Sequence, residues 1–119
     1  MRETFYLFAY GTLRTDPGGL LEGCERVATG VVRGTLYDLG EYPALILGGD
    51  DPVSGVIWRC PYPLLEALDR YEGTEAGLFR RVGIRVGDYP CWVYVAGPEL
   101  GPRLLPETRV ETRVGEESA

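Results

Sequence analysis

The sequence predicts an α+β fold in which about six short strands form a small curved mixed β-barrel with one main helix packed on it. Short runs rich in β-branched and aromatic residues recur along the 119-residue chain, separated by turns rich in glycine and proline. Glycines also lie inside these runs, which indicates curved strands. One stretch, residues 63–73, has the periodicity of a helix. Together these observations favour a curved sheet or barrel with a helix on it.

Strand-like runs fill most of the first sixty positions. The first is dense enough to be a strand buried on both faces, and Gly11 ends it. Residues 14–23 indicate a turn followed by one helical turn. The second run is long and is expected to bend at Gly34, and the last two could pair as a hairpin across the turn at 48–52. The four expected strands are residues 4–10, 28–39, 42–47 and 53–60.

A helix follows the fourth strand, and two more strands follow the helix. Pro63 suits a first helical turn because its missing N–H would be unpaired there. Apolar residues then recur at helical spacing, and Gly73 is a natural C-cap. Residues 79–86 and 91–96 are expected to be strands joined across residues 87–90. The helical apolar positions are Leu64, Leu65, Leu68 and Tyr71.

The length fits one domain, which we place at residues 1–105. Residues 106–119 are polar and acidic at the end, and we expect a polar C-terminal tail or an edge strand there. The 45% apolar content with 8 Tyr, 2 Trp and 3 Phe is sufficient for one core. The three cysteines lie far apart without a C-x-x-C pair, so we expect reduced, structural thiols, with Cys60 and Cys91 buried.

Charge and composition exclude several classes of partner. The formal net charge is −6 and no basic cluster stands out, which argues against nucleic acid. No run approaches the roughly 20 apolar residues that span a membrane, and no secretory signal is recognisable at the N-terminus. We therefore expect a cytoplasmic protein with no nucleic acid and no membrane partner, existing as a monomer or homodimer.

The absence of two residue types limits the possible chemistry. All 12 cations are Arg, so a Schiff base on a protein lysine, and with it a pyridoxal phosphate enzyme, is impossible. No His is present, which excludes Ser-His-Asp and Cys-His catalysis and any imidazole metal ligand. We expect no metal and no cofactor. Carboxylates, thiols, tyrosines and backbone amides remain.

Two short motifs carry the candidate chemistry. The first strand ends in Tyr10-Gly11-Thr12, where a glycine turn can present backbone N–H groups to a carboxylate, although an ordinary tight turn has the same pattern. Glu72 falls in the last turn of the helix, where the helix dipole and desolvation by Leu68 and Tyr71 raise the pKa of a carboxylate. Such a group suits general base catalysis near neutral pH; the alternative is an exposed acid near a helix end.

Asp69 lies one turn before Glu72 on the same helix face. The two could form a carboxylate pair that shares a proton, as in glycosidases. The more common alternative is that Asp69 hydrogen-bonds the following loop or Arg80 and Arg81.

The order and spacing of these motifs resemble the gamma-glutamylcyclotransferase-like family, including its AIG2-like and gamma-glutamylamine cyclotransferase branches. The resemblance extends to about Gly97. It rests on the elements Tyr10-Gly11-Thr12-Leu13, Leu36-Tyr37, Tyr42-Pro43-Ala44, Leu68-Asp69-x-x-Glu72-Gly73 and Phe79-Arg80.

The resemblance implies a small β-barrel enclosing a cavity, a loop that holds the glutamyl head of the substrate, and a glutamate that accepts a proton. Glu72 would be catalytic, and Tyr10, Gly11, Thr12 and Leu13 would bind substrate. Arg14, Tyr42 and Phe79 are further candidates for the substrate pocket.

The reaction implied by the resemblance is release of 5-oxoproline and a free amine or amino acid from a small γ-glutamyl substrate, without a cofactor. The sequence departs from the family at Phe79, where many members have Tyr, and it lacks a Gly-Asp-Trp type ending. Two alternatives stay open: a non-catalytic module that binds a carboxylate or amine ligand on the same fold, and a glycoside hydrolase using Asp69 and Glu72.

Overall fold

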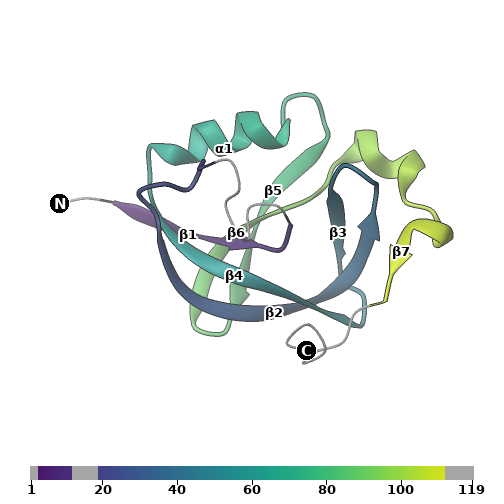
Figure 1. Ribbon diagram of the computed structural model, residues 1–119, viewed down its shortest axis with the longest axis horizontal. Helices are drawn as coiled ribbons and strands as arrows, with labels where there is room; N and C mark the ends of the chain where they lie inside the picture. The colour runs from purple at the N-terminus through teal and green to yellow at the C-terminus, as the bar shows by residue number, and fades with distance from the viewer. Residues whose placement is uncertain (1–2, 12–18, 112–119) are drawn as a thin grey trace.

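The computed structural model describes residues 3–11 and 19–111, in which a curled mixed sheet forms a half-barrel with one main helix (Figure 1). The predicted fold class is therefore confirmed. Helix α1 (Leu64–Glu72) precedes β5, and two 3-10 helices, η2 (Pro98–Arg103) and η3 (Pro106–Thr108), follow β6. The strands are β1 (Thr4–Ala9), β2 (Glu25–Asp38), β3 (Pro43–Leu47), β4 (Asp51–Pro61), β5 (Phe79–Val86), β6 (Tyr89–Ala96) and β7 (Arg109–Val110).

Strand β1 lies inside the sheet, whose order is β3-β2-β4-β1-β6-β5. It pairs antiparallel with β4 along its whole length and parallel with β6 at Tyr6 and Leu7. Because Phe5, Leu7, Phe8 and Ala9 are all buried, both faces of β1 are covered, as its dense apolar sequence predicts. The segment that follows β1 therefore starts from a rigid, central position.

The predicted hairpin between the strands at 42–47 and 53–60 is wrong. Strand β3 pairs with β2 from Gly34 to Asp38, and β4 pairs with the next stretch of β2, from Glu25 to Gly34. The two pairings meet at Gly34, where a Cβ would lie 2.4 Å from the Ile46 carbonyl oxygen, and a Cβ on Gly49 would lie 2.8 Å from the Gly34 backbone. Two glycines thus let the connection between β3 and β4 lie close to β2 at the predicted bend.

Helix α1 is confirmed, and so is its C-cap. Gly73 has a φ of 70°, the left-handed conformation that glycine adopts readily, and its N–H bonds the Arg70 carbonyl. Leu65 and Leu68 are buried against the sheet. Tyr71 is predicted to belong to the buried apolar face of the helix, but the residue is 57% exposed, because it lies at the rim of the cavity described below.

The buried residues form two clusters on the two sides of the curled sheet. One contains Phe5, Leu7, Leu65, Leu68 and neighbouring residues and is covered by α1 and η2. The other, around Phe8, Ile57 and Val93, fills the inside of the half-barrel. Cys60 and Cys91 are buried in these clusters, as predicted.

The end of the described chain returns to the sheet. Strands β5 and β6 form a hairpin that turns at Gly87 and Asp88. Strand β6 therefore begins at Tyr89, two residues before the predicted start of that strand. Residues Arg109 and Val110 then pair with β2 beyond the point where β4 leaves it. The predicted turn at residues 14–18 lies outside the described residues, and Gly19 to Cys24 forms hydrogen-bonded turns. None of the helices in 3–11 and 19–111 has the length and apolar character needed to cross a membrane.

Candidate active site

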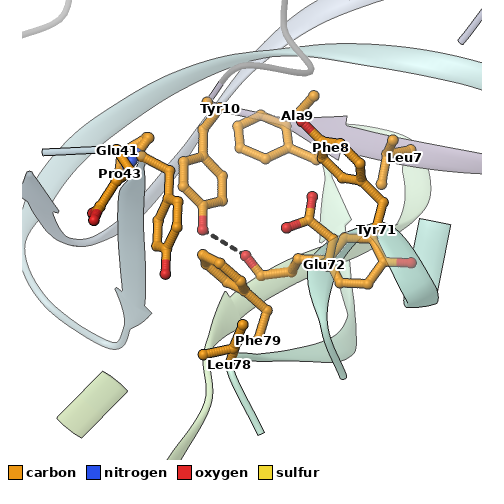
Figure 2. Close-up of a pocket in the computed structure, with 13 residues that line it drawn as sticks. Leu7, Phe8, Ala9, Tyr10, Glu41, Pro43, Tyr71, Glu72, Leu78 and Phe79 are labelled. Atoms are coloured by element: carbon orange, nitrogen blue, oxygen red, sulfur yellow. Dashed lines mark hydrogen bonds between the residues drawn. The ribbon is translucent and has the colours of Figure 1, made fainter. Parts of the chain in front are cut away.

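A cavity of about 270 Å³ opens where the end of β1 meets the end of α1 and the start of β5 (Figure 2). Its wall is mostly aromatic and aliphatic. Segments that are distant in the sequence supply it: β1, the turn before β3, the end of α1, the start of β5, and β6. The lining residues are Leu7, Phe8, Ala9, Tyr10, Gly11, Glu41, Tyr42, Pro43, Tyr71, Glu72, Leu78, Phe79 and Tyr94.

Glu72 is the last residue of α1, and its carboxylate faces this cavity among aromatic rings (Figure 2). Burial raises the pKa of Glu72 from its ordinary value of 4.5 to about 7. Within the described residues no hydrogen bond or ion pair to the carboxylate is present. The predicted rise in the pKa is confirmed, and desolvation by the cavity wall is its cause.

The Tyr10 side chain also lines the cavity, but its hydroxyl is already engaged by the backbone. It donates to the Tyr94 carbonyl over 2.6 Å, the dashed bond in Figure 2, and accepts from the Leu45 N–H over 3.2 Å. Burial, with a smaller contribution from the Glu72 charge, raises the pKa of the Tyr10 hydroxyl well above its usual range. Tyr10 is therefore a neutral side chain that fixes the end of β1 to two other strands.

Aromatic contacts define the wall opposite β1. The rings of Tyr42 and Phe79 meet edge to face with centroids 5.4 Å apart. Phe79 is buried and Tyr42 half-buried, and both line the cavity with Glu72. Gly11 lies near Pro43, since a Cβ at Gly11 would approach the Pro43 side chain to 3.0 Å.

The charge in the described part of the wall is negative. Glu72 and Glu41 are its two ionisable acids, and no Arg lies among these lining residues. Glu41 is exposed at the rim, where Arg103 donates to its carboxylate over 3.0 Å and to the Leu39 carbonyl over 2.7 Å. The Arg103 guanidinium lowers the pKa of Glu41. Glu41 is thus a paired carboxylate, whereas Glu72 has no partner within the described part of the chain.

Asp69 does not share the cavity with Glu72. Arg81 donates to both of its carboxylate oxygens, over 2.9 and 3.2 Å, and the Tyr94 hydroxyl donates over 2.7 Å. The alternative in which Asp69 bonds Arg81 is confirmed, and a carboxylate pair facing one substrate is wrong. Among residues 3–11 and 19–111, no three Cys, Asp or Glu side chains lie close enough together to hold a metal ion.

This chain matches one family model and several solved structures. The family model described as gamma-glutamyl cyclotransferase, AIG2-like, matches residues 7–112, which includes nearly all of the described chain. The chain belongs to this cyclotransferase family. No curated protein sequence gives a significant match.

Solved structures share the cyclotransferase-family fold. An AIG2-like protein from Mus musculus is 23% identical, with a TM-score of 0.78 over 98% of this chain and 93% of that one. A protein named gamma-glutamyl cyclotransferase is 20% identical, with a TM-score of 0.66 over 79% and 67% of the two chains. The protein PH0828 from Pyrococcus horikoshii is 20% identical, with a TM-score of 0.67 over 78% of each chain.

The cyclotransferase fold brings together most of the residues singled out in the sequence. Tyr10, Gly11, Tyr42, Phe79 and Glu72 all line the one cavity. Thr12, Leu13 and Arg14 lie outside the described residues, and their binding roles stay predictions.

Sequence reasoning did not single out several lining residues of this cyclotransferase-family cavity, among them Phe8, Leu78 and Tyr94. Phe8 and Leu78 look like ordinary core residues in the sequence. Tyr94 carried a usable signal, because strand alternation places it on the same face of β6 as Trp92 and Ala96. Its partner Asp69 is 25 positions away in the sequence, so the contact itself has no local signature.

Proposed function

We propose that this protein is a cyclotransferase that converts a small γ-glutamyl substrate into 5-oxoproline and a free amine, with Glu72 as the acid-base residue. One observation carries the proposal: a carboxylate with a pKa of about 7 faces an aromatic cavity and has no partner within the described residues. A base of this pKa is half ionised at neutral pH, which suits proton transfer in both directions.

The proposed reaction needs one proton acceptor and a folded substrate. Glu72 takes a proton from the substrate α-ammonium group, and the free amine attacks the γ-carbonyl carbon. Glu72 then returns the proton to the leaving nitrogen and the C–N bond to that nitrogen breaks. The ring nitrogen gives up its second proton to the departing amine, which leaves as an ammonium group while Glu72 is again ionised. Nucleophile and electrophile belong to one molecule, so the protein contributes mainly orientation and stabilisation of the oxyanion.

The remaining lining residues suggest how the substrate is held. The glycine turn at Tyr10 and Gly11 is proposed to bind the α-carboxylate through backbone N–H groups, and residues 12–14 stay predicted binding residues. The leaving amine would lie toward Tyr71, Tyr42 and Glu41 at the rim. Since the described wall contains two carboxylates and no cation, neutral or cationic leaving amines should be favoured over anionic ones.

The test is to incubate the protein with γ-glutamyl substrates whose leaving amines are neutral, cationic or anionic, and to measure 5-oxoproline. Glu72→Gln should lower kcat by about 100- to 10,000-fold. Glu66→Gln is the matched control, because Glu66 is an exposed acid in the first turn of the same helix. The activity of the wild type should also fall on the acid side of a limb near pH 7 as Glu72 becomes protonated.

Equal background in the wild type and in Glu72→Gln would refute the cyclotransferase. Binding of a γ-glutamyl compound without turnover would instead support the non-catalytic binding module. Release of sugar from a glycoside would support the glycoside hydrolase alternative, which the separation of Asp69 from the cavity disfavours.

A further inference from the structure

Asp69 is the centre of a hydrogen-bond network that joins the helix carrying Glu72 to strands β5 and β6. It accepts three hydrogen bonds, two from Arg81 and one from the Tyr94 hydroxyl. The Asp69 and Arg81 side chains are only 26% and 25% exposed. A bidentate pair in a half-buried setting has a defined geometry, since Nε and one terminal nitrogen of Arg81 each bond a different carboxylate oxygen of Asp69.

The partners of Asp69 are themselves fixed. The Arg81 guanidinium lies over the Trp92 ring, 4.3 Å from its centroid. Tyr94 is buried, its ring lines the cavity, and its hydroxyl is bound to Asp69. The Tyr94 carbonyl accepts the hydrogen bond from Tyr10. Tyr94 is therefore held at its side-chain end by α1 and at its backbone by the end of β1.

The last turn of α1 depends on this anchor. The helix has only nine residues, and its buried contacts are made by Leu65 and Leu68, in its first and middle turns. The Asp69 carbonyl accepts bonds from the Thr74 N–H and the Thr74 hydroxyl, over 3.1 and 3.3 Å. The Glu72 carboxylate has no hydrogen bond among the described residues. Its position is therefore determined by the backbone of the last turn of α1, which Asp69 fixes.

We propose that Asp69 is a positioning residue of the site: with Arg81 and Tyr94 it holds the Glu72 carboxylate at a fixed place relative to Tyr10 and the glycine turn. A chain of hydrogen bonds runs from Asp69 through Tyr94 and Tyr10 to Leu45. It spans α1, β6, β1 and β3, which are the elements that surround the cavity. The kinetic part of this inference rests on the proposed function.

The pair also sets the charge near Glu72. Asp69 and Arg81 cancel each other, and burial is accordingly the cause of the raised pKa of Glu72. The other titratable groups in the cavity with Glu72 are Tyr10, Tyr42, Tyr71, Tyr94 and Glu41. Removal of one member of the pair leaves the other charge uncompensated one helical turn from Glu72.

Two substitutions with opposite charge effects test this arrangement. In Asp69→Asn the cation Arg81 is unpaired, so the pKa of Glu72 should fall; in Arg81→Gln the anion Asp69 is unpaired, so it should rise. The pKa is read directly from the pH titration of the ¹³C carboxyl signal of Glu72, which requires no turnover. A loosened fold would move the pKa in the same direction in both variants, toward the ordinary value.

A third variant separates position from charge. Tyr94→Phe keeps the Asp69–Arg81 pair and removes only the hydroxyl that links it to β6, so the pKa of Glu72 should stay near the wild-type value. The kcat for 5-oxoproline formation should fall by about tenfold while KM changes little, because a small displacement of a catalytic group mainly lowers the rate. Arg80→Gln is the control, since Arg80 is the exposed neighbour of Arg81 on β5.

The outcomes distinguish the two proposals. Wild-type kcat in Tyr94→Phe, or shifts of the same sign in Asp69→Asn and Arg81→Gln, would overturn the positioning role. If wild-type protein forms no 5-oxoproline, the proposed function fails. The carboxyl titration then still tests the arrangement on which the positioning role depends: opposite shifts support a charge pair fixed beside Glu72, and shifts of one sign overturn it.

Discussion

Glu72 and Asp69 stand one turn apart on the same helix and differ in what surrounds them. Asp69 receives a cation and a hydroxyl, whereas Glu72 faces aromatic rings in a cavity. Two carboxylates in such different environments suit different purposes, and under the proposed function Asp69 holds structure while Glu72 exchanges protons. The raised pKa of Glu72 follows from its burial without a partner among residues 3–11 and 19–111.

A raised pKa at Glu72 has a measurable cost in stability. In the folded protein the charged form is disfavoured, so the contribution of Glu72 to the free energy of unfolding is greatest below the ordinary pKa of 4.5 and is lost as pH rises through about 7. We expect Glu72→Gln to increase the free energy of unfolding at pH 8 by about 1 to 3 kcal/mol and to change it little at pH 4. Denaturant unfolding at the two pH values measures this difference.

Glu66→Gln serves as the control for this measurement, because Glu66 is exposed on the first turn of α1 and should show no such dependence on pH. A Glu72→Gln variant with equal stability changes at pH 4 and pH 8 would mean that the Glu72 carboxylate is solvated in the folded protein.

At the residue scale, the sequence identified Glu72 as a candidate base more readily than it identified the hydrogen-bond partners of Asp69. Glu72 was identifiable because an acid at a helix C-terminus opposes the helix dipole. Whether Asp69 or Glu72 carries the unpaired carboxylate depends on Arg81 and Tyr94, which the fold brings to Asp69 from two later strands. Such a choice has no local signal.

At the scale of elements, α1 and its cap place Glu72 at the cavity. The helix was predictable because periodicity, Pro63 and Gly73 are all local features. The pairing of β3 was not predictable in the same way. The turn at Gly48 and Gly49 resembles a hairpin turn, but both flanking strands pair with β2, and this arrangement depends on the close approach of Gly49 to Gly34, which is distant in the sequence.

Gly73→Ala tests the role of the cap. Gly73 has a φ of 70°, and a Cβ there would lie 2.9 Å from the Leu78 side chain, which lines the cavity. We expect a loss of about 2 kcal/mol in stability, from the left-handed backbone and the contact together, and a lower kcat because the end of α1 shifts. Chemical denaturation and 5-oxoproline assays measure the two effects.

Gly87→Ala is the matched control for the backbone effect. Its φ is 60°, and a Cβ there would meet nothing within 4 Å. It lies in the turn between β5 and β6, so we expect a loss of about 1 kcal/mol in stability with unchanged kcat. Equal losses of activity in both variants would show that the cap does not position Glu72.

At the scale of the whole molecule, the cavity exists because the sheet curls into a half-barrel whose two edge strands, β3 and β5, do not pair with each other. Glycines inside the strand-like runs predicted a curved sheet, and the dense apolar sequence of the first run predicted a strand covered on both faces. The parallel pairing of β1 with β6 makes the sheet mixed. It joins segments more than eighty positions apart and has no local signature in the sequence of either strand. The cavity therefore became visible only once the strand order was known.

Tyr10 links the open sides of this curled sheet. Its hydroxyl bonds the Leu45 N–H on β3 and the Tyr94 carbonyl on β6, two strands that are not neighbours in the sheet. Tyr10→Phe keeps the ring but leaves two half-buried backbone groups without this partner. We expect a loss of about 1 to 3 kcal/mol in stability, together with faster amide hydrogen exchange at Leu45. Tyr6→Phe is the control, because no hydrogen bond to the Tyr6 hydroxyl is present within residues 3–11 and 19–111, and its ring packs on Tyr89. Equal stability losses in the two variants would mean that the ring of Tyr10, and not its hydroxyl, holds β3 and β6 together around the cavity.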